Sequence, residues 1–438
     1  MEVYFLVIIT FIMFIFVLLY DKDLLSPSAM ICESFLISLL VLSVNINEWS
    51  VNLSMKTIAI ILIGNLVFVI TSIVYQYMLK KKGNKKIVER KNKPIEIDNI
   101  NFNILLIFSI IAAVVYVYYF YQSVGGFTNF TELSKAINYY RVSVSYDLGD
   151  AREIPTIVTQ LIKVIKVFSL ISIYIYINNH FYNKQSEIKV ENKFRYIVPM
   201  LLFIPLSLLT GNRSELSTII IAIVVMWNFT SMRYGYKLNL KKIQKFGALF
   251  IIAILLFSMT KNITGRTSES DGFDYFSIYF GAPIELLDLY VKEPPEKSDM
   301  IGKETFWSLN NTLMQLKGED GYQIHLEVRY INNVKLGNVY TAYRNMYQDF
   351  GFFGLIVLQI VVSVIFTKMY VRIKTMRCNG KVSIYELMYA LMVHVLLFYS
   401  FSEQFFNSVI SINYVTLLLL FMVVLFFLTK VRFRKKVE

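Results

Sequence analysis

The stretch "VYFLVIITFIMFIFVLLY", residues Val3 to Tyr20, is a continuous apolar run near the start of the chain. A helix rises about 1.5 Å per residue, so this run is long enough to cross a hydrocarbon core of about 30 Å. A cleavable signal sequence would end in small residues, but Asp21, Lys22 and Asp23 follow the run directly. We therefore expect the run to remain in the protein as its first membrane span.

Comparable runs recur along the chain, which has 438 residues, 56% of them apolar and only 17% charged. The sequence therefore predicts an all-α polytopic membrane protein with about 11 transmembrane helices, within a range of about 10 to 12. The predicted spans are residues 3–20, 28–45, 56–79, 104–122, 155–178, 196–210, 216–232, 247–261, 351–370, 384–402 and 411–429.

The distribution of lysine and arginine predicts the orientation of these spans. Basic residues gather in four segments, which are 80–93, 233–245, 368–381 and the tail from Lys430. All four lie on one side of an eleven-span count, and an excess of basic residues is typical of short cytoplasmic loops. We therefore expect an external N-terminus and an internal C-terminus. The net charge of +13 is then an orientation signal that requires no nucleic-acid partner.

The segment 262–350 lies on the opposite side of this count and holds thirteen carboxylates against eight Lys and Arg residues. The predicted organisation is therefore 1–261 with spans one to eight, a large extracytoplasmic loop at 262–350 that caps the active site, and 351–438 with the last three spans and a basic cytoplasmic tail. Within the loop, residues 273–291 mix aromatic, apolar and acidic side chains. This mixture predicts an amphipathic helix on the membrane surface or partly re-entrant.

The sequence motifs of several enzyme classes are absent. The chain contains no glycine-rich phosphate loop, no Ser-His-Asp set, no HExxH and no CxxC. Its histidines are His180, His325 and His394, and its cysteines, Cys32 and Cys378, lack metal-ligand spacing. Chemistry that depends on a bound metal is not expected.

Isolated cations at the predicted outer boundary are the first candidate site residues. Arg213 lies in the short turn "GNRSE" between two predicted spans. Its side chain either reaches lipid phosphate or clamps a phosphorylated ligand with its planar fork. Lys163 and Lys166 lie one turn apart in a predicted helix that Pro155 begins. Ammonium groups inside the membrane are costly without an anion. We therefore expect both lysines to bind substrate, unless the span is tilted.

A second candidate is the stretch "GNVYTAYRNMYQDFGFFG", residues Gly337 to Gly354. Rings at the headgroup level explain the tyrosines. They do not explain why Arg344 stands beside so many neutral hydrogen-bonding groups, together with Asp349. Sugars are bound by hydroxyl and amide groups with aromatic faces, so the composition suits a saccharide next to a phosphate. The neutral groups are Asn338, Tyr340, Thr341 and Tyr343.

Two segments carry a family resemblance. The stretch "GNVYTAYRNMYQDFGFFGLIVLQIVVSVIF" resembles the region after the large external loop of Wzy-type oligosaccharide repeat-unit polymerases, the O-antigen and capsular polysaccharide polymerases of bacteria. The stretch "LLTGNRSELSTIIIAIVVMW" resembles their segment with an arginine between two spans. Many spans and one dominant external loop late in the chain extend the resemblance to the whole topology.

The resemblance implies glycosyl transfer on the outer leaflet of a bacterial plasma membrane. A polymer held through undecaprenyl pyrophosphate is transferred onto a fresh lipid-linked repeat unit, with a flippase and a chain-length regulator as possible partners. Arg213 and Arg344, assisted by Lys163 and Lys166, would stabilise the departing pyrophosphate. The base that takes the acceptor proton remains open among Glu215, Asp349, Asp274 and His325, and His325 is also a candidate for substrate binding. No cofactor, nucleotide sugar or metal is required.

Three alternatives remain open at this stage. An O-antigen ligase would transfer a finished chain to another acceptor. A GT-C lipid-phosphosugar transferase is suggested by the acidic "DKD" at Asp21 to Asp23, although that linker is short and predicted to be cytoplasmic. A lipid-linked oligosaccharide flippase could use the same lysines, but transporters often show half-to-half repeats, and none is visible.

Overall fold

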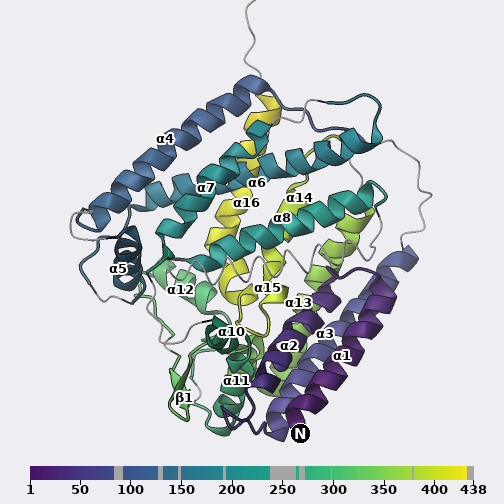
Figure 1. Ribbon diagram of the computed structural model, residues 1–438, viewed down its shortest axis with the longest axis vertical. Coiled ribbons are helices and arrows are strands. Elements are labelled where there is room, and N and C mark those ends of the chain that lie inside the picture. Colours follow the sequence, from purple (N-terminus) through teal and green to yellow (C-terminus); the bar gives the residue numbers. More distant parts are fainter. Residues whose placement is uncertain are drawn as a thin grey trace, which may run out of the picture. The chain divides into compact units, whose positions relative to one another are not determined.

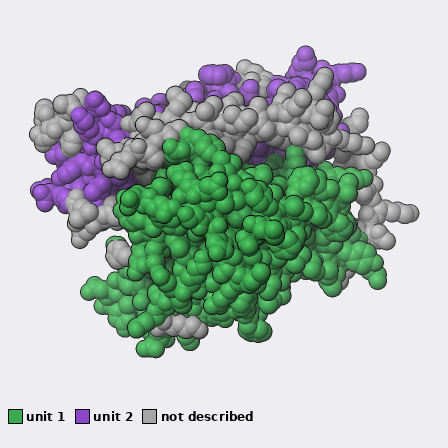
Figure 2. All heavy atoms as spheres, turned by 60° about the horizontal axis from the view of Figure 1, so that its bottom comes forward, with its two compact units in different colours: residues 1–87, 268–372, 392–414 green, residues 88–267, 373–391, 415–438 purple. Residues whose placement is uncertain are grey.

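The computed structural model of the chain describes all residues except 83–91, 127–131, 147–148, 191–193, 237–262, 266–271, 297, 325, 377–378 and 432–438. The chain forms two compact units, each assembled from separate parts of the sequence. Unit 1 comprises 1–87, 268–372 and 392–414, and unit 2 comprises 88–267, 373–391 and 415–438 (Figure 2). These units differ from the predicted three consecutive parts, which divide the chain by membrane topology and not by packing.

Unit 1 is built around three consecutive helices that lie side by side, α1, α2 and α3 (Figure 1). Its helices are α1 (Glu2–Asp21), α2 (Pro27–Val44), α3 (Met55–Lys82), α10 (Gly272–Phe280), α11 (Ala282–Lys292), α12 (Trp307–Leu316), α13 (Ala342–Thr375), α15 (His394–Leu397) and the π-helical turn η3 (Phe405–Val409). A two-stranded antiparallel sheet pairs β1 (Arg329–Ile331) with β2 (Val334–Gly337).

Unit 2 contains a second group of packed helices, in which α6 contacts α4, α7 and α8. Its elements are α4 (Asn99–Ser123), α5 (Leu133–Tyr146), α6 (Thr156–Gln185), η2 (Phe194–Tyr196), α7 (Val198–Leu209), α8 (Arg213–Arg233), α14 (Ile384–Met392) and most of α16 (Ile412–Lys430). As predicted, Pro155 precedes α6 as its N-cap residue. Asn212 caps α8 by accepting from the backbone N–H of Ser214 at 3.2 Å.

Eight helices in the described part of the chain are long and apolar enough to cross a membrane. By helix length and hydropathy the protein is therefore a multi-pass membrane protein, and the all-α prediction holds for its architecture. The eight are α1, α2, α3, α4, α6, α8, α13 and α16. The predicted span 196–210 corresponds to the shorter helix α7, and 384–402 is divided between α14 and α15. The predicted span 247–261 lies outside the described residues.

The predicted amphipathic segment 273–291 is helical, but it forms two helices, α10 and α11, separated at Gly281. A Cβ atom at Gly281 would lie 3.1 Å from the backbone nitrogen of Leu42 and 3.0 Å from Val41. The absence of a side chain thus lets this corner approach α2 closely.

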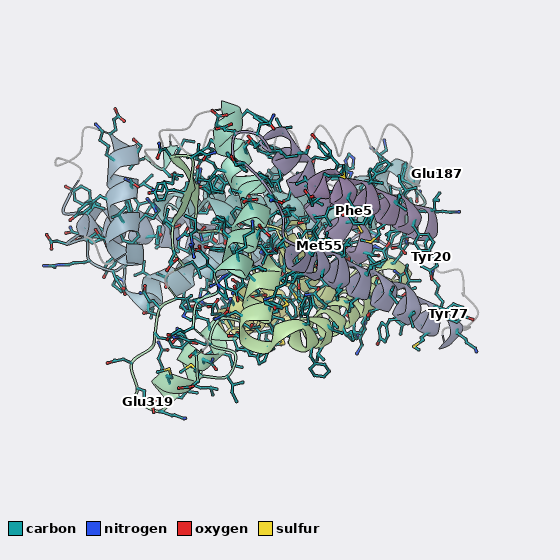
Figure 3. The ribbon with its side chains drawn as sticks, turned by 90° about the horizontal axis from the view of Figure 1, so that it is seen from below. Phe5, Tyr20, Met55, Tyr77, Glu187 and Glu319 are labelled. Atoms are coloured by element: carbon teal, nitrogen blue, oxygen red, sulfur yellow. The ribbon has the colours of Figure 1, made fainter. Side chains whose placement is uncertain are left out.

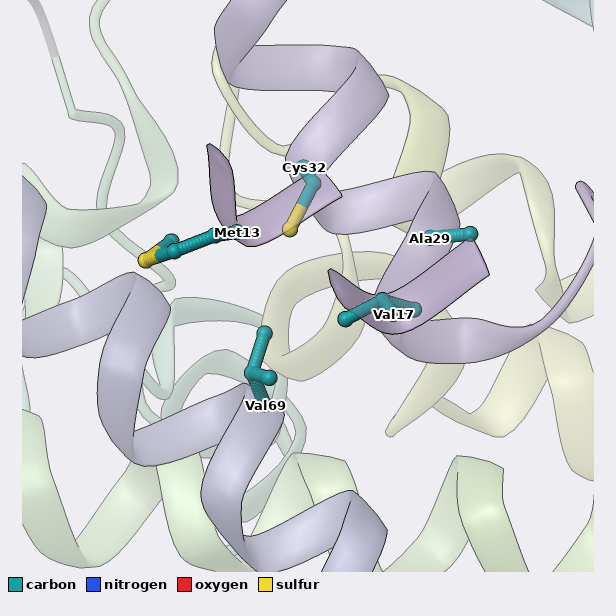
Figure 4. Packing of buried hydrophobic residues seen from close by; sticks show 5 residues of the cluster. All are labelled: Met13, Val17, Ala29, Cys32 and Val69. Carbon is teal, nitrogen blue, oxygen red and sulfur yellow. The ribbon is translucent and has the colours of Figure 1, made fainter. Parts of the chain in front are cut away.

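The first three helices of unit 1 pack through a small apolar cluster. Met13 and Val17 of α1 meet Ala29 and Cys32 of α2 and Val69 of α3 (Figure 4). Figure 3 shows α1 and α3 running side by side, with Phe5 and Met55 near one pair of ends and Tyr20 and Tyr77 near the other. The outward faces carry apolar side chains such as Phe5, which is exposed. Exposed apolar faces of this kind are what lipid-facing helices present.

Helix α13 connects this bundle to the residues that the sequence singled out. Gly351 interrupts it with φ 63° and ψ −160°, a backbone conformation accessible essentially to glycine alone. Before this kink, the fully buried Tyr343 stacks on Phe35 with ring centroids 4.9 Å apart, and its hydroxyl donates to Asn65 Oδ1 at 2.7 Å. A Cβ atom at Gly64 would lie 2.5 Å from the ring of Tyr343, so this glycine packs directly against the ring.

We predict that Gly64→Val destabilises the protein by about 1–3 kcal/mol, because the ring of Tyr343 is held on both sides and cannot retreat. Thermal unfolding of the purified protein in detergent, followed by tryptophan fluorescence, measures the change. Leu66→Val introduces the same side chain at an exposed position of α3 and should leave the midpoint nearly unchanged. Equal midpoints for the two variants would show that the contact does not constrain α3.

Candidate functional site

Arg344 lies in the first turn of α13 and is almost completely buried, with 4% of its surface exposed. The first residue of that helix, Ala342, donates its backbone N–H to the carbonyl of Tyr399 at 2.9 Å. The guanidinium carbon lies 4.8 Å from the ring centroid of Tyr290 on α11 and 4.9 Å from that of Tyr340. Aromatic faces attract a cation, so two rings stabilise the guanidinium group.

The charge of Arg344 is paired with Glu304, from the segment that precedes α12. Both terminal nitrogens donate to the carboxylate, Nη1 to Oε2 and Nη2 to Oε1, the latter at 3.3 Å. This two-pronged contact matches the fork of arginine. Its Nε is buried and has no hydrogen-bond partner among the described residues. Nη1 also donates to Asn345 Oδ1 at 3.4 Å, so Nε is the guanidinium nitrogen that is left without a partner among the described residues.

Asp349 lies on the same helix but does not contact Arg344 through any of its hydrogen bonds. Its Oδ2 accepts the backbone N–H groups of Glu304 at 3.2 Å and Thr305 at 2.7 Å. These contacts fix the main chain that carries Glu304. Asp349 was predicted as a catalytic residue and possible base, whereas its contacts in the structure are those of a positioning residue.

Burial raises the pKa of the Glu304 carboxyl above its ordinary value, although Arg344 acts in the opposite direction. Asp349 adds to the increase, and Lys303 opposes it. A carboxyl whose charged form is destabilised by burial takes up a proton more readily. Glu304, the acid next to Arg344, thus has the properties of a proton acceptor.

The neutral groups predicted to bind substrate are distributed unevenly around Arg344. Tyr340 covers one face of the guanidinium, and its hydroxyl donates to the carbonyl of Glu327 at 3.4 Å. The buried Thr341 hydroxyl has no partner among the described residues. Asn338 donates to the carbonyl of Leu326 at 3.3 Å. Tyr343 points into the helix bundle, where its hydroxyl is already bonded, so it packs the unit and does not face the site.

Two further candidates for the base remain outside this group. Asp274 is exposed in the first turn of α10. His325 lies outside the described residues. Among the described residues, no contact connects Asp274 to Arg344.

Unit 2 gathers the remaining predicted cations where α8 begins. Arg213 is the first residue of α8 and is buried, with 3% of its surface exposed. Lys166 of α6 pairs with Glu215 of α8 at 2.6 Å, and Lys163 lies one turn earlier on α6. Glu215 was predicted as a catalytic residue and possible base, and the structure gives it a lysine partner.

Arg141 of α5 joins these residues and had not been identified from the sequence. A Cβ atom at Gly211 would lie 3.0 Å from the side chain of Arg141, so this side chain lies against the turn before α8. Gly211 itself has φ 69°, a conformation that favours glycine. The positive end of the α8 dipole adds to the positive potential of this region. Arg213, the two lysines and Arg141 therefore lie on the elements that meet at the start of α8, where Glu215 pairs with Lys166, and we refer to them as the Arg213 group.

The chain was compared with protein-family models, with curated proteins and with solved structures, and none of the three comparisons finds a match. The functional argument therefore depends on the residues themselves. The Arg344 group belongs to unit 1 and the Arg213 group to unit 2. That both arginines stabilise one departing pyrophosphate stays a prediction.

Glu285 of α11 is a second unusual acid of unit 1. It is buried, with 2% of its surface exposed, and its Oε2 has no hydrogen-bond partner among the described residues. Burial raises its pKa to about 7, with a further increase from Asp288 and an opposing effect of Lys292. This carboxyl is therefore neutral in the folded protein at mildly acidic pH.

We predict that Glu285→Gln stabilises the protein at pH 8 and changes little at pH 5. The folded pKa lies above the unfolded one, so the stabilising contribution of the neutral acid is present below the unfolded pKa and is lost as pH rises through about 7. Glutamine keeps the neutral shape, so its advantage should grow with pH to about 3 kcal/mol at most.

Unfolding midpoints measured between pH 5 and pH 8 check this prediction. Glu319→Gln, at the exposed position labelled in Figure 3, is the matched control and should follow the wild-type pH dependence. A constant difference between Glu285→Gln and the wild type across this range would contradict the burial of an uncompensated carboxyl.

Proposed function

We propose that this protein polymerises undecaprenyl-pyrophosphate-linked oligosaccharide repeat units into a surface polysaccharide, by glycosyl transfer on the outer leaflet of a bacterial plasma membrane. The observation that carries the proposal is the environment of Arg344. A buried guanidinium is held by two tyrosine rings and one carboxylate, within the segment that resembles the polymerases. Such a group suits a ligand that joins a sugar to a diphosphate.

The proposed topology has eleven spans, with residues 262–350 outside the cell and the basic loops in the cytoplasm. The charge asymmetry between the two sides supports this orientation. The folded elements of the large loop also support it. Helices α10, α11 and α12 and the β1–β2 hairpin give the loop the structure expected of a cap. Tyr290, Glu304 and Tyr340, whose side chains contact the Arg344 guanidinium, also belong to it.

In the proposed reaction, a hydroxyl oxygen of the fresh repeat unit attacks the anomeric carbon of the polymer. The bond from that carbon to the pyrophosphate oxygen breaks, and its electron pair leaves with the pyrophosphate. The leaving group is an anion, so fixed cations lower the barrier to its departure. Arg344 supplies one such cation. Arg213, with Lys163 and Lys166, supplies a second cationic group for the diphosphate or its lipid.

The acids of the "DKD" segment have contacts that do not suit the GT-C alternative. Asp21 accepts from the hydroxyl of Ser28 at 3.0 Å. Asp23 accepts from the hydroxyl of Tyr370 at 2.7 Å and from the backbone N–H of Leu25 at 3.1 Å. Both are buried, so they serve the corner between α1 and α2. These contacts favour the polymerase over a transferase that uses acids after its first span.

We predict that a cysteine at position 298 is labelled from outside intact cells by a membrane-impermeant maleimide, because Ser298 is exposed and lies in the large loop. The native cysteines are replaced by serine in this experiment. A cysteine at the exposed Lys189, between predicted spans five and six, is the internal control and should react only after permeabilisation. The reverse pattern would overturn both the orientation and the outer-leaflet site.

We predict that loss of the gene abolishes long surface polysaccharide and leaves single lipid-linked repeat units. The wild-type gene should restore the polymer.

Arg344→Ala and Arg213→Ala should each reduce polymer formation by about 10²- to 10³-fold, the usual cost of removing one preorganised donor. Arg→Lys should rescue only partly, because the charge remains but the planar fork is lost.

Chain-length gels at matched protein levels measure this effect, and the alternatives predict other patterns. A lipid-anchoring arginine would make Arg→Lys nearly silent, because lysine also reaches the headgroups. Repeat units retained on the cytoplasmic leaflet would indicate a flippase. Polymer that is complete but not attached to its acceptor would indicate a ligase.

A further inference from the structure

The Glu304 carboxylate occupies the two terminal nitrogens of Arg344 that a diphosphate would need. Both terminal nitrogens of the guanidinium donate to its carboxylate, and tyrosine rings lie on the group from α11 and from the segment before α13. A phosphate bound in two-pronged fashion uses the same nitrogens. An anionic ligand can therefore reach the fork only if the Glu304 carboxylate leaves it.

The main chain at Glu304 is held independently of Arg344. Asp349 accepts the backbone N–H groups of Glu304 and Thr305, and the hydroxyl of Tyr322 donates to the carbonyl of Lys303 at 2.6 Å. Phe306 donates its N–H to the carbonyl of Gly302 at 2.8 Å. With its backbone fixed at these points, Glu304 can change its side-chain rotamer without opening the segment.

We propose that Glu304 is an internal anion that keeps Arg344 in place, exchanges with the diphosphate of the substrate, and then accepts the proton of the attacking hydroxyl. The proposal rests on the function proposed above and adds the missing base. The hydroxyl oxygen bonds to the anomeric carbon, the electron pair of the broken bond leaves with the diphosphate held by Arg344, and the hydroxyl proton passes to the Glu304 carboxylate.

Exchange also makes Glu304 a stronger base at the moment it is needed. Burial already raises the pKa of its carboxyl, while the attraction of Arg344 limits that rise. When Arg344 binds the diphosphate instead, its attraction for the Glu304 carboxylate weakens, but the carboxyl stays buried. Proton uptake by Glu304 then becomes more favourable. The charged or titratable groups that face Glu304 are Arg344 and Asp349 of α13, Tyr290 of α11, and the neighbouring Lys303 and Tyr322.

Binding of inorganic pyrophosphate to the full-length protein in nanodiscs tests the exchange directly. Glu304→Gln should bind pyrophosphate roughly tenfold more tightly than the wild type, as expected if the carboxylate occupies the fork about nine-tenths of the time. Glu304→Asp keeps the charge on a shorter side chain, so its pyrophosphate affinity should be intermediate. It provides a second test if Glu304→Gln does not fold. Arg344→Ala should remove the difference between glutamate and glutamine at position 304.

A matched control comes from another arginine–glutamate pair of unit 1. Arg329 donates to Glu293 at 2.9 Å, but Glu293 is largely exposed. Glu293→Gln should therefore leave pyrophosphate affinity at the wild-type value. The advantage of Glu304→Gln should also shrink as pH falls, because protonation of Glu304 in the wild type releases Arg344 as well. Equal or weaker binding by Glu304→Gln, or an advantage independent of pH, would overturn the exchange.

Polymer formation tests the second half of the proposal. Glu304→Gln should bind pyrophosphate more tightly and yet lose polymer, because it cannot take up the proton. Tight binding with normal polymer would overturn the role as a base and leave the exchange standing. Failure of the proposed function is distinguishable from both outcomes, since gene loss would then leave the polysaccharide unchanged whatever the pyrophosphate measurements give.

Discussion

A buried guanidinium must have its charge compensated, and this requirement at Arg344 determines how the segments around it are arranged. An arginine with 4% exposure and no counter-charge would destabilise the fold severely. Compensation comes from Glu304 before α12, from Tyr290 on α11, and from Tyr340 before α13. Three segments distant in sequence are thereby brought to one point. The proposed exchange of Glu304 for a diphosphate would keep this compensation, because one anion would replace the other at the guanidinium group.

Local sequence patterns predicted the long helices and singled out Arg344, but they could not identify the partner of this arginine. Apolar periodicity and Pro155 predicted the long helices, and the isolated cation marked Arg344. Glu304 stands forty residues earlier, in a segment with no recognisable motif, and only the tertiary fold joins the two. For the same reason Asp349 and Glu215 could be recognised as acids near a site, whereas their partners could not. Those partners are the backbone before α12 and Lys166, respectively.

Apolar composition also could not show where the helix of a predicted span is interrupted. The predicted span 384–402 becomes α14 and α15, because its last residues turn into a polar corner of unit 1. There Ser400 bonds with Ser34 and Ser38 of α2 at 2.9 Å and 2.6 Å. The adjacent Glu403 accepts the N–H groups of Phe406 and Asn407, and burial raises its pKa to about 7. Hydropathy averages over a whole segment, so an interruption by a few polar residues does not change its signal.

The most direct measurement is a reaction with purified components. The protein in nanodiscs is supplied with lipid-linked repeat units of the host strain, and the products are identified by mass spectrometry. Lipid-linked dimers and longer chains should form with the release of one undecaprenyl pyrophosphate per bond, and the Arg344→Ala variant should form neither. Formation of dimers at an unchanged rate by Arg344→Ala, or no product from a folded wild-type protein, would contradict a diphosphate site at Arg344.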